Sequence, residues 1–247
     1  MKGFKIYIII LMVMLFLLGM ATFLYPYIRK VVVDSDLRSD AQAFIDRVTV
    51  ELWEEEYFPE EQVQETTEPA NKELLEAMQT YNECIYAEKQ QGLCDPWSYQ
   101  QPSFVLGEFG LNDETFGVIS IPAIDLSMPI YLGATNTHLA DGAALLSQTS
   151  IPIGGINTNA VIAGHRGWYG ASYFRYITDL QIGDEVIITN LWGELTYEVV
   201  ATEIIAPNEV DKILIQDGKD MITLLTCHPY ASGGKQRYLI FCERKNV

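Results

Sequence analysis

The chain has 247 residues, of which 49% are hydrophobic and 20% are charged, a balance that is ordinary for a folded protein and argues against a largely disordered one. It carries 33 acidic and 16 basic side chains, a formal net charge of −17 at pH 7. This excess of negative charge argues against nucleic acid or anionic lipid as a binding partner, because both are themselves anionic.

The first predicted element is a membrane-spanning helix over residues 6–28, which contain no charged residue. At a rise of about 1.5 Å per residue the helix reaches roughly 34 Å, enough to cross a bilayer. The apolar part of a cleavable signal peptide is only about 7–15 residues long, so an uncleaved signal anchor is favoured. Lys2 and Lys5 precede the span while Arg29 and Lys30 follow it, which leaves the positive charges nearly balanced. The acidic bulk after the span favours a single-pass protein of the cell membrane whose remaining chain is extracellular.

Residues 29–109 read as a helical, acidic preface. Asp34 and Ser35 are typical helix-start residues, and the sequence after them predicts a helix that ends before the stretch at residues 58–70. Residues 51–70 contain eight glutamates and no basic residue. Such a run is typical of a solvated linker or helix surface rather than of a binding site.

A second helix is predicted from residue 71 to a stop at Gly92. Its apolar residues recur at steps of four, three and four, which places them on one helical face. They are Leu74, Met78, Tyr81 and Ile85. A stripe of this kind is typical of a packing face rather than of a ligand site.

From about residue 116 the sequence changes to short β-rich runs separated by turn residues, and only one clear helical segment, residues 172–180, interrupts them. This repetition favours an antiparallel or mixed barrel or sandwich. The chain therefore divides into a membrane anchor at residues 1–28, the helical preface at residues 29–109, and a C-terminal β domain at residues 110–247.

The four cysteines and three histidines show no metal-binding pattern. The chain has no C-x-x-C pair and no H-E-x-x-H motif, so we expect no metal. Cys84 and Cys94 are close enough in the chain to be bridged in an oxidising compartment, and two free thiols are equally compatible with the sequence. His138 lies in a turn-rich stretch without other reactive side chains nearby, which favours a structural role.

Cys227 is the candidate nucleophile, because it ends an apolar, strand-like run and is followed by Pro229 and glycines that stop the strand. A thiolate nucleophile requires a base or a positive charge beside it and a donor for the oxyanion. His228 is adjacent in sequence, but successive side chains of an extended chain point to opposite faces. We therefore expect His228 to face away from Cys227.

Two residues farther away fit these requirements. His165 follows an apolar run that ends at Gly164, and Arg237 begins the last β-rich run ten residues after Cys227, as in two antiparallel strands joined by a loop. The alternatives are a structural histidine and an exposed strand-end arginine. Cys242 is five residues beyond Arg237, so alternation places it on the opposite face, where we expect it to pack.

Taken together, "TLLTC" at residues 223–227, His165 in "AGHRG" and Arg237 in "QRYLIF" resemble the signature of the sortases, the cysteine transpeptidases of Gram-positive cell surfaces. The resemblance covers about residues 110–243. It implies a mainly β fold, an eight-stranded sortase-type β-barrel, with Cys227, His165 and Arg237 at one rim as the catalytic residues.

A second resemblance is to class C, pilin-polymerising sortases, in which a DPW or DPF loop upstream of the barrel folds over the active site. Asp95, Pro96 and Trp97 in "CDPWSYQ" match that motif. The resemblance implies that these three residues form a lid in the loop between the second helix and the barrel.

The activity implied by the resemblance is a two-step acyl transfer. The Cys227 thiolate would attack the Thr–Gly carbonyl of an LPxTG-like sorting signal of a pilin or surface protein, and Arg237 would stabilise the oxyanion or hold the peptide. His165 would protonate the leaving amine and then deprotonate the incoming one. Residues 206–220 would help to select the peptide, and no cofactor is implied.

Two alternatives to pilus assembly remain. In a pilin polymerase the incoming amine is a lysine of the next pilin, whereas a housekeeping sortase uses an amine of a cell-wall precursor to anchor surface proteins. A surface scaffold without turnover would instead contain a deeply buried, unreactive Cys227 with His165 turned away.

Overall fold

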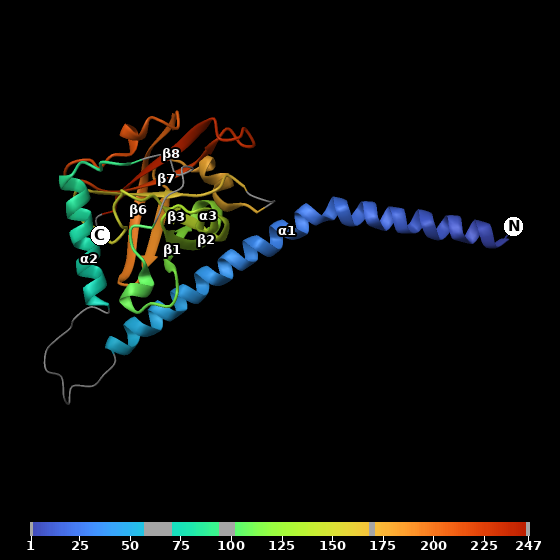
Figure 1. The fold of residues 1–247 in the computed structure, drawn as a ribbon, viewed down its shortest axis with the longest axis horizontal. Coiled ribbons are helices and arrows are strands. Elements are labelled where there is room, and N and C mark those ends of the chain that lie inside the picture. The colour runs from blue at the N-terminus through green and yellow to red at the C-terminus, as the bar shows by residue number, and fades with distance from the viewer. Residues whose placement is uncertain (1, 57–70, 94–101, 168–170, 246–247) are drawn as a thin grey trace.

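The computed structural model describes residues 2–56, 71–93, 102–167 and 171–245. A closed eight-stranded β-barrel forms the body of the molecule, and two long helices lie beside it (Figure 1). The predicted eight-stranded barrel with an N-terminal helical region is confirmed.

The strands of the barrel follow one another closely in the second half of the chain. They are β1 (Thr115–Ile121), β2 (Leu126–Leu132), β3 (Ala143–Leu145), β4 (Thr158–Ala163), β5 (Glu185–Asn190), β6 (Gly193–Ile205), β7 (Asp220–His228) and β8 (Gln236–Arg244). Their order around the barrel is β1-β2-β3-β4-β7-β8-β6-β5. β2 pairs with β3, and β4 with β7, in parallel, while the other neighbours are antiparallel. β4, β7 and β8 therefore lie side by side.

The helices comprise three α-helices and four 3-10 helices in the described residues. They are α1 (Lys2–Glu56), α2 (Lys72–Ala87), α3 (Asn136–Asp141), η1 (Leu106–Phe109), η2 (Pro122–Ile124), η3 (Tyr173–Asp179) and η4 (Val210–Ile213). η3 corresponds to the helical segment predicted at residues 172–180. The prediction of a single helical interruption was too restrictive, because Thr135 accepts a hydrogen bond from the backbone nitrogen of His138 at 3.1 Å and so caps the short α3.

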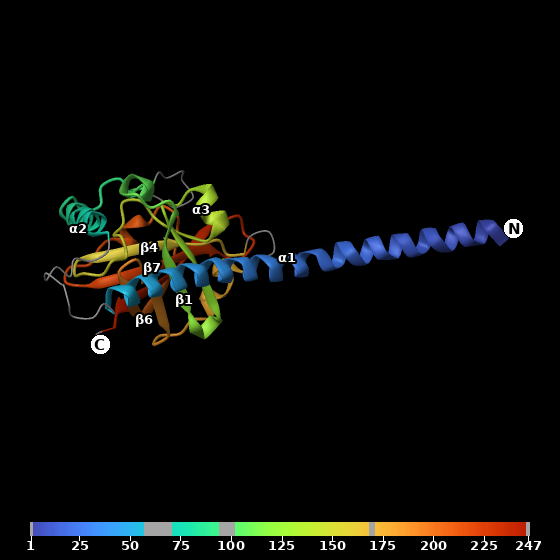
Figure 2. The same cartoon turned by 90° about the horizontal axis from the view of Figure 1, so that it is seen from below.

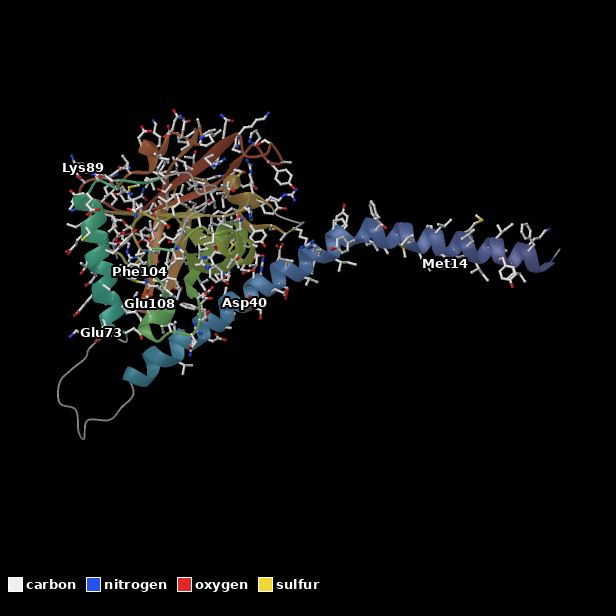
Figure 3. The ribbon with its side chains drawn as sticks, viewed as in Figure 1. Met14, Asp40, Glu73, Lys89, Phe104 and Glu108 are labelled. Atoms are coloured by element: carbon white, nitrogen blue, oxygen red, sulfur yellow. The ribbon has the colours of Figure 1, made fainter. Side chains whose placement is uncertain are left out.

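α1 is one continuous helix, whereas the sequence predicted a new start at Asp34 and Ser35. Its 55 residues extend over roughly 80 Å. The N-terminal part, which includes Met14, stands clear of the barrel, and the later part, which includes Asp40, runs beside it (Figures 2 and 3). The predicted start is wrong because Asp34 does not cap its own helix; its carboxylate accepts hydrogen bonds from the backbone nitrogen and the Oγ of Ser172, both at 2.8 Å.

The later part of α1 buries a stripe of side chains against the barrel. The stripe recurs at steps of four, three and four residues, as expected of one helical face. It consists of Leu37, Ala41, Phe44 and Val48, none of which is more than 7% exposed. The position of α1 beside the barrel therefore rests mainly on apolar packing.

α2 packs as its apolar stripe predicted, with Leu74, Met78 and Ile85 buried. Asn82 lies on the same side and exchanges two hydrogen bonds with the backbone of Ile151, donating to its oxygen at 3.0 Å and accepting from its nitrogen at 2.7 Å. These bonds satisfy the buried backbone nitrogen and oxygen of Ile151, so Asn82 contributes to holding α2 on the barrel.

The predicted end of the second helix at Gly92 is wrong, because the helix ends five residues earlier at Ala87. Gln90 has a φ of 52° and turns the chain. Its buried side chain then donates to the oxygen of Gln148 at 3.1 Å and accepts from the nitrogen of Ile215 at 2.6 Å. Tertiary hydrogen bonds thus replace the last predicted turn of the helix.

Strands β4, β7 and β8 are buried on both faces, which explains their nearly continuous apolar runs. Along β7, Ile222 and Leu224 belong to the main core, while Met221 and Leu225 belong to a second cluster. The second cluster consists of Ala134, Leu139, Ala144, Leu146, Val161, Ala163, Ile205, Ile213, Met221, Leu225, Leu239 and Phe241. The candidate site lies at the end of the face that carries this second cluster.

Candidate active site

Cys227 and Arg237 lie directly opposite each other on the antiparallel strands β7 and β8, and opposite residues share one face of a sheet. Nη1 of Arg237 lies 3.9 Å from Sγ of Cys227. The same nitrogen donates to the backbone oxygens of Gly234 at 2.7 Å and Gln236 at 3.1 Å. Arg237 is only 3% exposed, so the alternative of an exposed strand-end arginine is wrong. Its guanidinium is held beside the sulfur.

His165 approaches the same place from β4, which pairs with β7 in parallel as far as Leu225. The two segments remain hydrogen-bonded beyond the end of β4. The nitrogen of Gly164 donates to the oxygen of Leu225 at 3.0 Å, and Oγ1 of Thr226 donates to the oxygen of Gly164 at 2.8 Å. Continuing this register by two residues beyond Ala163 and Leu225 places His165 opposite Cys227.

One face of β4, β7 and β8, continued past the end of β4, carries the side chains of His165, Cys227 and Arg237. Alternate residues along a strand share a face, and the preceding residues with the same alternation, such as Ala163 and Leu225, belong to the second cluster. The strands therefore bring the three predicted site residues together at one rim of the barrel.

His228 lies on the other face. Its Nδ1 is 2.7 Å from Nη1 of Arg166, whose Nη2 donates to Oγ1 of Thr178 at 3.1 Å, and its ring is tilted against that of Tyr238 at 5.7 Å. Because a guanidinium can only donate, Nδ1 must accept and carries no proton. Burial, together with the positive charge of Arg166, lowers the pKa of His228. These contacts agree with the expectation that His228 faces away from Cys227.

The protonation of His165 follows from its burial, which lowers its pKa from 6.5 to about 4, since removal from water disfavours the charged ring. The imidazole is therefore neutral at pH 7. Arg237 remains positive at this pH, because a guanidinium cannot be deprotonated in a protein. The resting site thus combines the Cys227 sulfur, a neutral imidazole and a permanently charged guanidinium.

Cys242 provides a contrast within the same strand as Arg237. Its side chain is 0% exposed in the main core, and burial raises the pKa of its thiol. A thiol of this kind is unreactive at neutral pH. The expectation that Cys242 packs in the interior is confirmed.

The backbone before His165 is shaped by a close contact that the sequence reasoning missed. A Cβ added to Gly164 would lie 2.7 Å from the Phe174 ring, so only glycine leaves room for this ring. The backbone nitrogen of Phe174 donates to the oxygen of His165 at 2.9 Å. The only sequence signal was a glycine at the end of an apolar run.

The two threonines of "TLLTC" also have structural partners that sequence reasoning did not assign. Thr226 bonds to Gly164, as described above, and Oγ1 of Thr223 donates to Oδ1 of Asn159 at 2.9 Å. Nδ2 of Asn159 in turn donates to the oxygen of Ile213 in η4 at 3.0 Å. Polar side chains at buried positions were the available signal, because such groups require hydrogen-bond partners.

The proposed lid residues Asp95, Pro96 and Trp97 lie outside the described residues, so the lid stays a prediction. Cys94 also lies outside them. Cys84 is a free, exposed thiol on α2.

His138 has the surroundings of a structural residue. Its ring stacks on Tyr131 with centroids 5.2 Å apart, and its Nδ1 lies 2.7 Å from the backbone oxygen of Gly133. In the part of the chain that the structure describes, no cluster of three or more histidine, cysteine, aspartate or glutamate side chains could hold a metal ion.

A closed eight-stranded barrel that brings a cysteine, a histidine and an arginine to one rim is the architecture expected of a sortase. A sequence profile of the sortase domain matches residues 119–245. Sortase D of Bacillus subtilis (strain 168) is 31% identical over 130 residues, which are 52% of this chain and 63% of that protein. The chain thus spans less than two thirds of the length of this relative.

Solved structures give the same result. Sortase C1 of GBS pilus island 1 is 28% identical and has a TM-score of 0.69, with 85% of this chain and 92% of that chain covered. Sortase C-1 from Actinomyces oris is 31% identical and has a TM-score of 0.64, with 72% and 100% covered. The chain belongs to the sortase family, and class C sortases are among its structural neighbours.

Proposed function

We propose that this chain is a membrane-anchored, class C-like sortase, which cleaves an LPxTG-like sorting signal through a thioester at Cys227 and transfers the acyl group to an amine. The observation that carries the proposal is the contact between Cys227 and Arg237, together with the strand register that brings His165 beside them. Similarity to class C structures, one of them from a pilus island, supports a pilin lysine as the acceptor.

In the first step the Cys227 sulfur attacks the carbonyl carbon of the Thr–Gly bond. Because His165 is neutral at pH 7, an unprotonated ring nitrogen can accept the thiol proton as the C–S bond forms. The carbonyl oxygen becomes an oxyanion beside the Arg237 guanidinium, which stabilises it. The C–N bond then breaks, and His165 passes its proton to the leaving glycine amine. A thioester and a neutral imidazole remain.

In the second step an amine attacks the thioester carbon. His165 takes a proton from the attacking amine, and the C–S bond of the tetrahedral intermediate breaks. The proton returns from His165 to the Cys227 sulfur, so that an amide and the original site are formed. The same residues thus serve both steps, with His165 alternating between base and acid.

We further propose that α1 holds the enzyme in the cell membrane with the barrel on the extracellular side. The helix contains a stretch with a mean hydropathy of 2.7, and none of that stretch is buried. Large side chains on it such as Phe16 and Phe23 are 70% and 68% exposed. An apolar surface of this extent favours a lipid environment over water.

The thioester is the direct test. The full-length chain in detergent is incubated with an LPxTG-type peptide, and mass spectrometry locates the acyl adduct. We expect the adduct on Cys227 in the parent and in the Cys242→Ala variant, and none in Cys227→Ala. An adduct on Cys242 overturns the assignment of Cys227 as the nucleophile, and the absence of an adduct from every variant overturns the proposed activity and leaves the non-catalytic surface scaffold.

The acceptor is tested separately by adding a lysine-containing pilin peptide or a cell-wall precursor amine to the acyl-enzyme. An isopeptide bond to the pilin lysine is the expected product. A product formed with the wall amine alone contradicts the pilin acceptor and indicates a housekeeping sortase.

The lid is tested at Trp97. If Asp95, Pro96 and Trp97 cover the site, Trp97→Ala should raise the rate at which a methanethiosulfonate reagent labels Cys227. An unchanged labelling rate removes the claim of occlusion and leaves the rest of the proposal standing.

A further inference from the structure

Asp34 links the helix that continues the membrane anchor to the segment that follows His165. Its carboxylate accepts two hydrogen bonds from Ser172, one from the backbone nitrogen and one from Oγ, both at 2.8 Å. The side chain is 24% exposed and lies 3.7 Å from Nζ of Lys30 on the same helix. The contact joins residues 138 positions apart in the chain, and no step of the proposed reaction uses it.

Ser172 leads into a turn with a strained backbone. The next residue, Tyr173, has a φ of 41°, a left-handed conformation that residues with a side chain rarely adopt. Its hydroxyl donates to a backbone oxygen of α3 at 2.5 Å, and its ring stands edge-on to that of His165 at 6.1 Å. The backbone nitrogen of Phe174 then donates a hydrogen bond to the backbone oxygen of His165 at 2.9 Å. The turn therefore touches both the ring and the backbone of His165.

The contact with Ser172 can be removed without displacing α1. The buried stripe of α1, residues 37–48, packs on the barrel, and Arg38 adds an ion pair with Asp125 at 2.7 Å. That pair is exposed and should contribute little to stability. A groove of about 190 Å³ borders Asp34, Ser172 and Tyr173, so truncation of the carboxylate leaves no buried, unpaired charge.

We propose that Asp34 is a positioning residue for His165: through Ser172 it holds the strained turn that braces the histidine, so the helix leading from the anchor forms part of the support of the active site. The inference rests on the proposed function, because it assigns Asp34 to the geometry of the same reaction. Release of Ser172 lets the turn relax and lets the imidazole move away from its position beside Cys227.

The test compares Asp34→Ala with Arg38→Ala in the full-length chain in detergent. Arg38→Ala is the matched control, because it removes a contact between α1 and the barrel one helical turn away and leaves Ser172 bound. For Asp34→Ala we expect kcat of peptide cleavage to fall on the order of tenfold, since small misplacements of a reacting group are costly. KM should stay within about twofold, because Asp34 does not touch the peptide. Arg38→Ala should retain the parental values.

A second measurement separates positioning from a loss of stability. The ring of His165 is followed by NMR of the histidine-labelled chain while the pH is varied. Tyr173 lies edge-on to this ring, the strand register brings Cys227 and Arg237 to the same rim, and all three are unchanged in the variants. The midpoint should lie at about 4 in the parent and in Arg38→Ala. In Asp34→Ala it should move upward, because a ring that has lost its brace is better solvated.

The inference is overturned if Asp34→Ala has the parental kcat and the parental His165 midpoint, or if Arg38→Ala changes both to the same extent. Should Asp34→Ala fail to fold, Asp34→Asn and Ser172→Ala replace it, since each removes only part of the contact. Smaller changes in the same direction support the inference, and parental behaviour of both variants overturns it. The titration of His165 needs no sorting peptide. It therefore tests the positioning role of Asp34 even if the chain does not catalyse the proposed reaction.

Discussion

Replacement of Gly164 by alanine tests the close packing behind His165. The added Cβ would lie 2.7, 2.8 and 3.1 Å from three carbons of the Phe174 ring. Carbon atoms in good contact are about 3.5–4.0 Å apart, so the ring would have to move by roughly 0.8 Å. Phe174 is 0% exposed and cannot move outward without displacing its neighbours.

Overpacking of this kind costs about 1–3 kcal/mol of the free energy of unfolding, which corresponds to a decrease in Tm of roughly 3–10 °C for a chain of this size. Activity should also fall, because the backbone nitrogen of Phe174 is bonded to the oxygen of His165. We expect a loss of peptide cleavage on the order of tenfold or more. Thermal unfolding and peptide turnover of the Gly164→Ala variant measure the two effects.

Gly107 provides the control, because an added Cβ there meets no atom within 4 Å. Gly107→Ala should keep its Tm within about 2 °C of the parent. Phe174→Leu should partly relieve the clash, so the double variant with Gly164→Ala should be more stable than the sum of the single effects predicts. A Gly164→Ala variant with parental Tm and activity, or strictly additive effects, would refute the reasoning.

Four further predictions concern the site and the attachment of α2. Arg237→Lys keeps the charge but loses the planar fork of donors, and thioester formation at Cys227 should slow by about 10²–10³-fold; a parental rate contradicts the oxyanion role. His165→Ala should reduce peptide turnover by about 10²–10⁴-fold and His228→Phe by less than about tenfold, whereas the reverse order would make His228 the base. Because folding lowers the pKa of His165 from 6.5 to about 4, the unfolded chain binds more protons between these values. Stability should therefore fall as the pH falls through this window, and His165→Asn should flatten that part of the plot of Tm against pH; a slope equal to the parent's speaks against the buried neutral ring. Asn82→Ala leaves the buried backbone nitrogen of Ile151 unpaired, while its oxygen keeps the hydrogen bond from the nitrogen of Ile153, and should cost about 1–3 kcal/mol; a decrease in Tm below about 2 °C would show that α2 is held by its apolar stripe alone.

Several features of the site could be predicted from the residues themselves. The β-rich runs indicated the barrel domain, and the ten-residue spacing between Cys227 and Arg237 predicted that they are neighbours on two antiparallel strands. Strand alternation predicted that His228 and Cys227 lie on opposite faces and that Cys242 packs in the core, as the structure has them. These predictions succeed because side-chain alternation and hairpin pairing are local properties of the backbone.

Other features could not be predicted from the residues. The apolar run before His165 predicted a strand, and the family resemblance associated this histidine with Cys227. No local pattern, however, predicted that β4 pairs with β7 in parallel. Asp34 looked like the start of a helix and is instead bonded to Ser172. Gln90 likewise leaves the second helix for distant backbone partners.

What the sequence alone determined is therefore the character of each segment: an apolar span, two helices of which the second has a packing face, short strands, and the face on which each reactive side chain lies. Closure of the barrel decided which strands adjoin, and with it the meeting of His165, Cys227 and Arg237. Tertiary packing also brought Asp34 of α1 within hydrogen-bond distance of Ser172. The physical reason is that periodicity is set by neighbours along the chain, whereas contacts between distant segments depend on how the whole core packs.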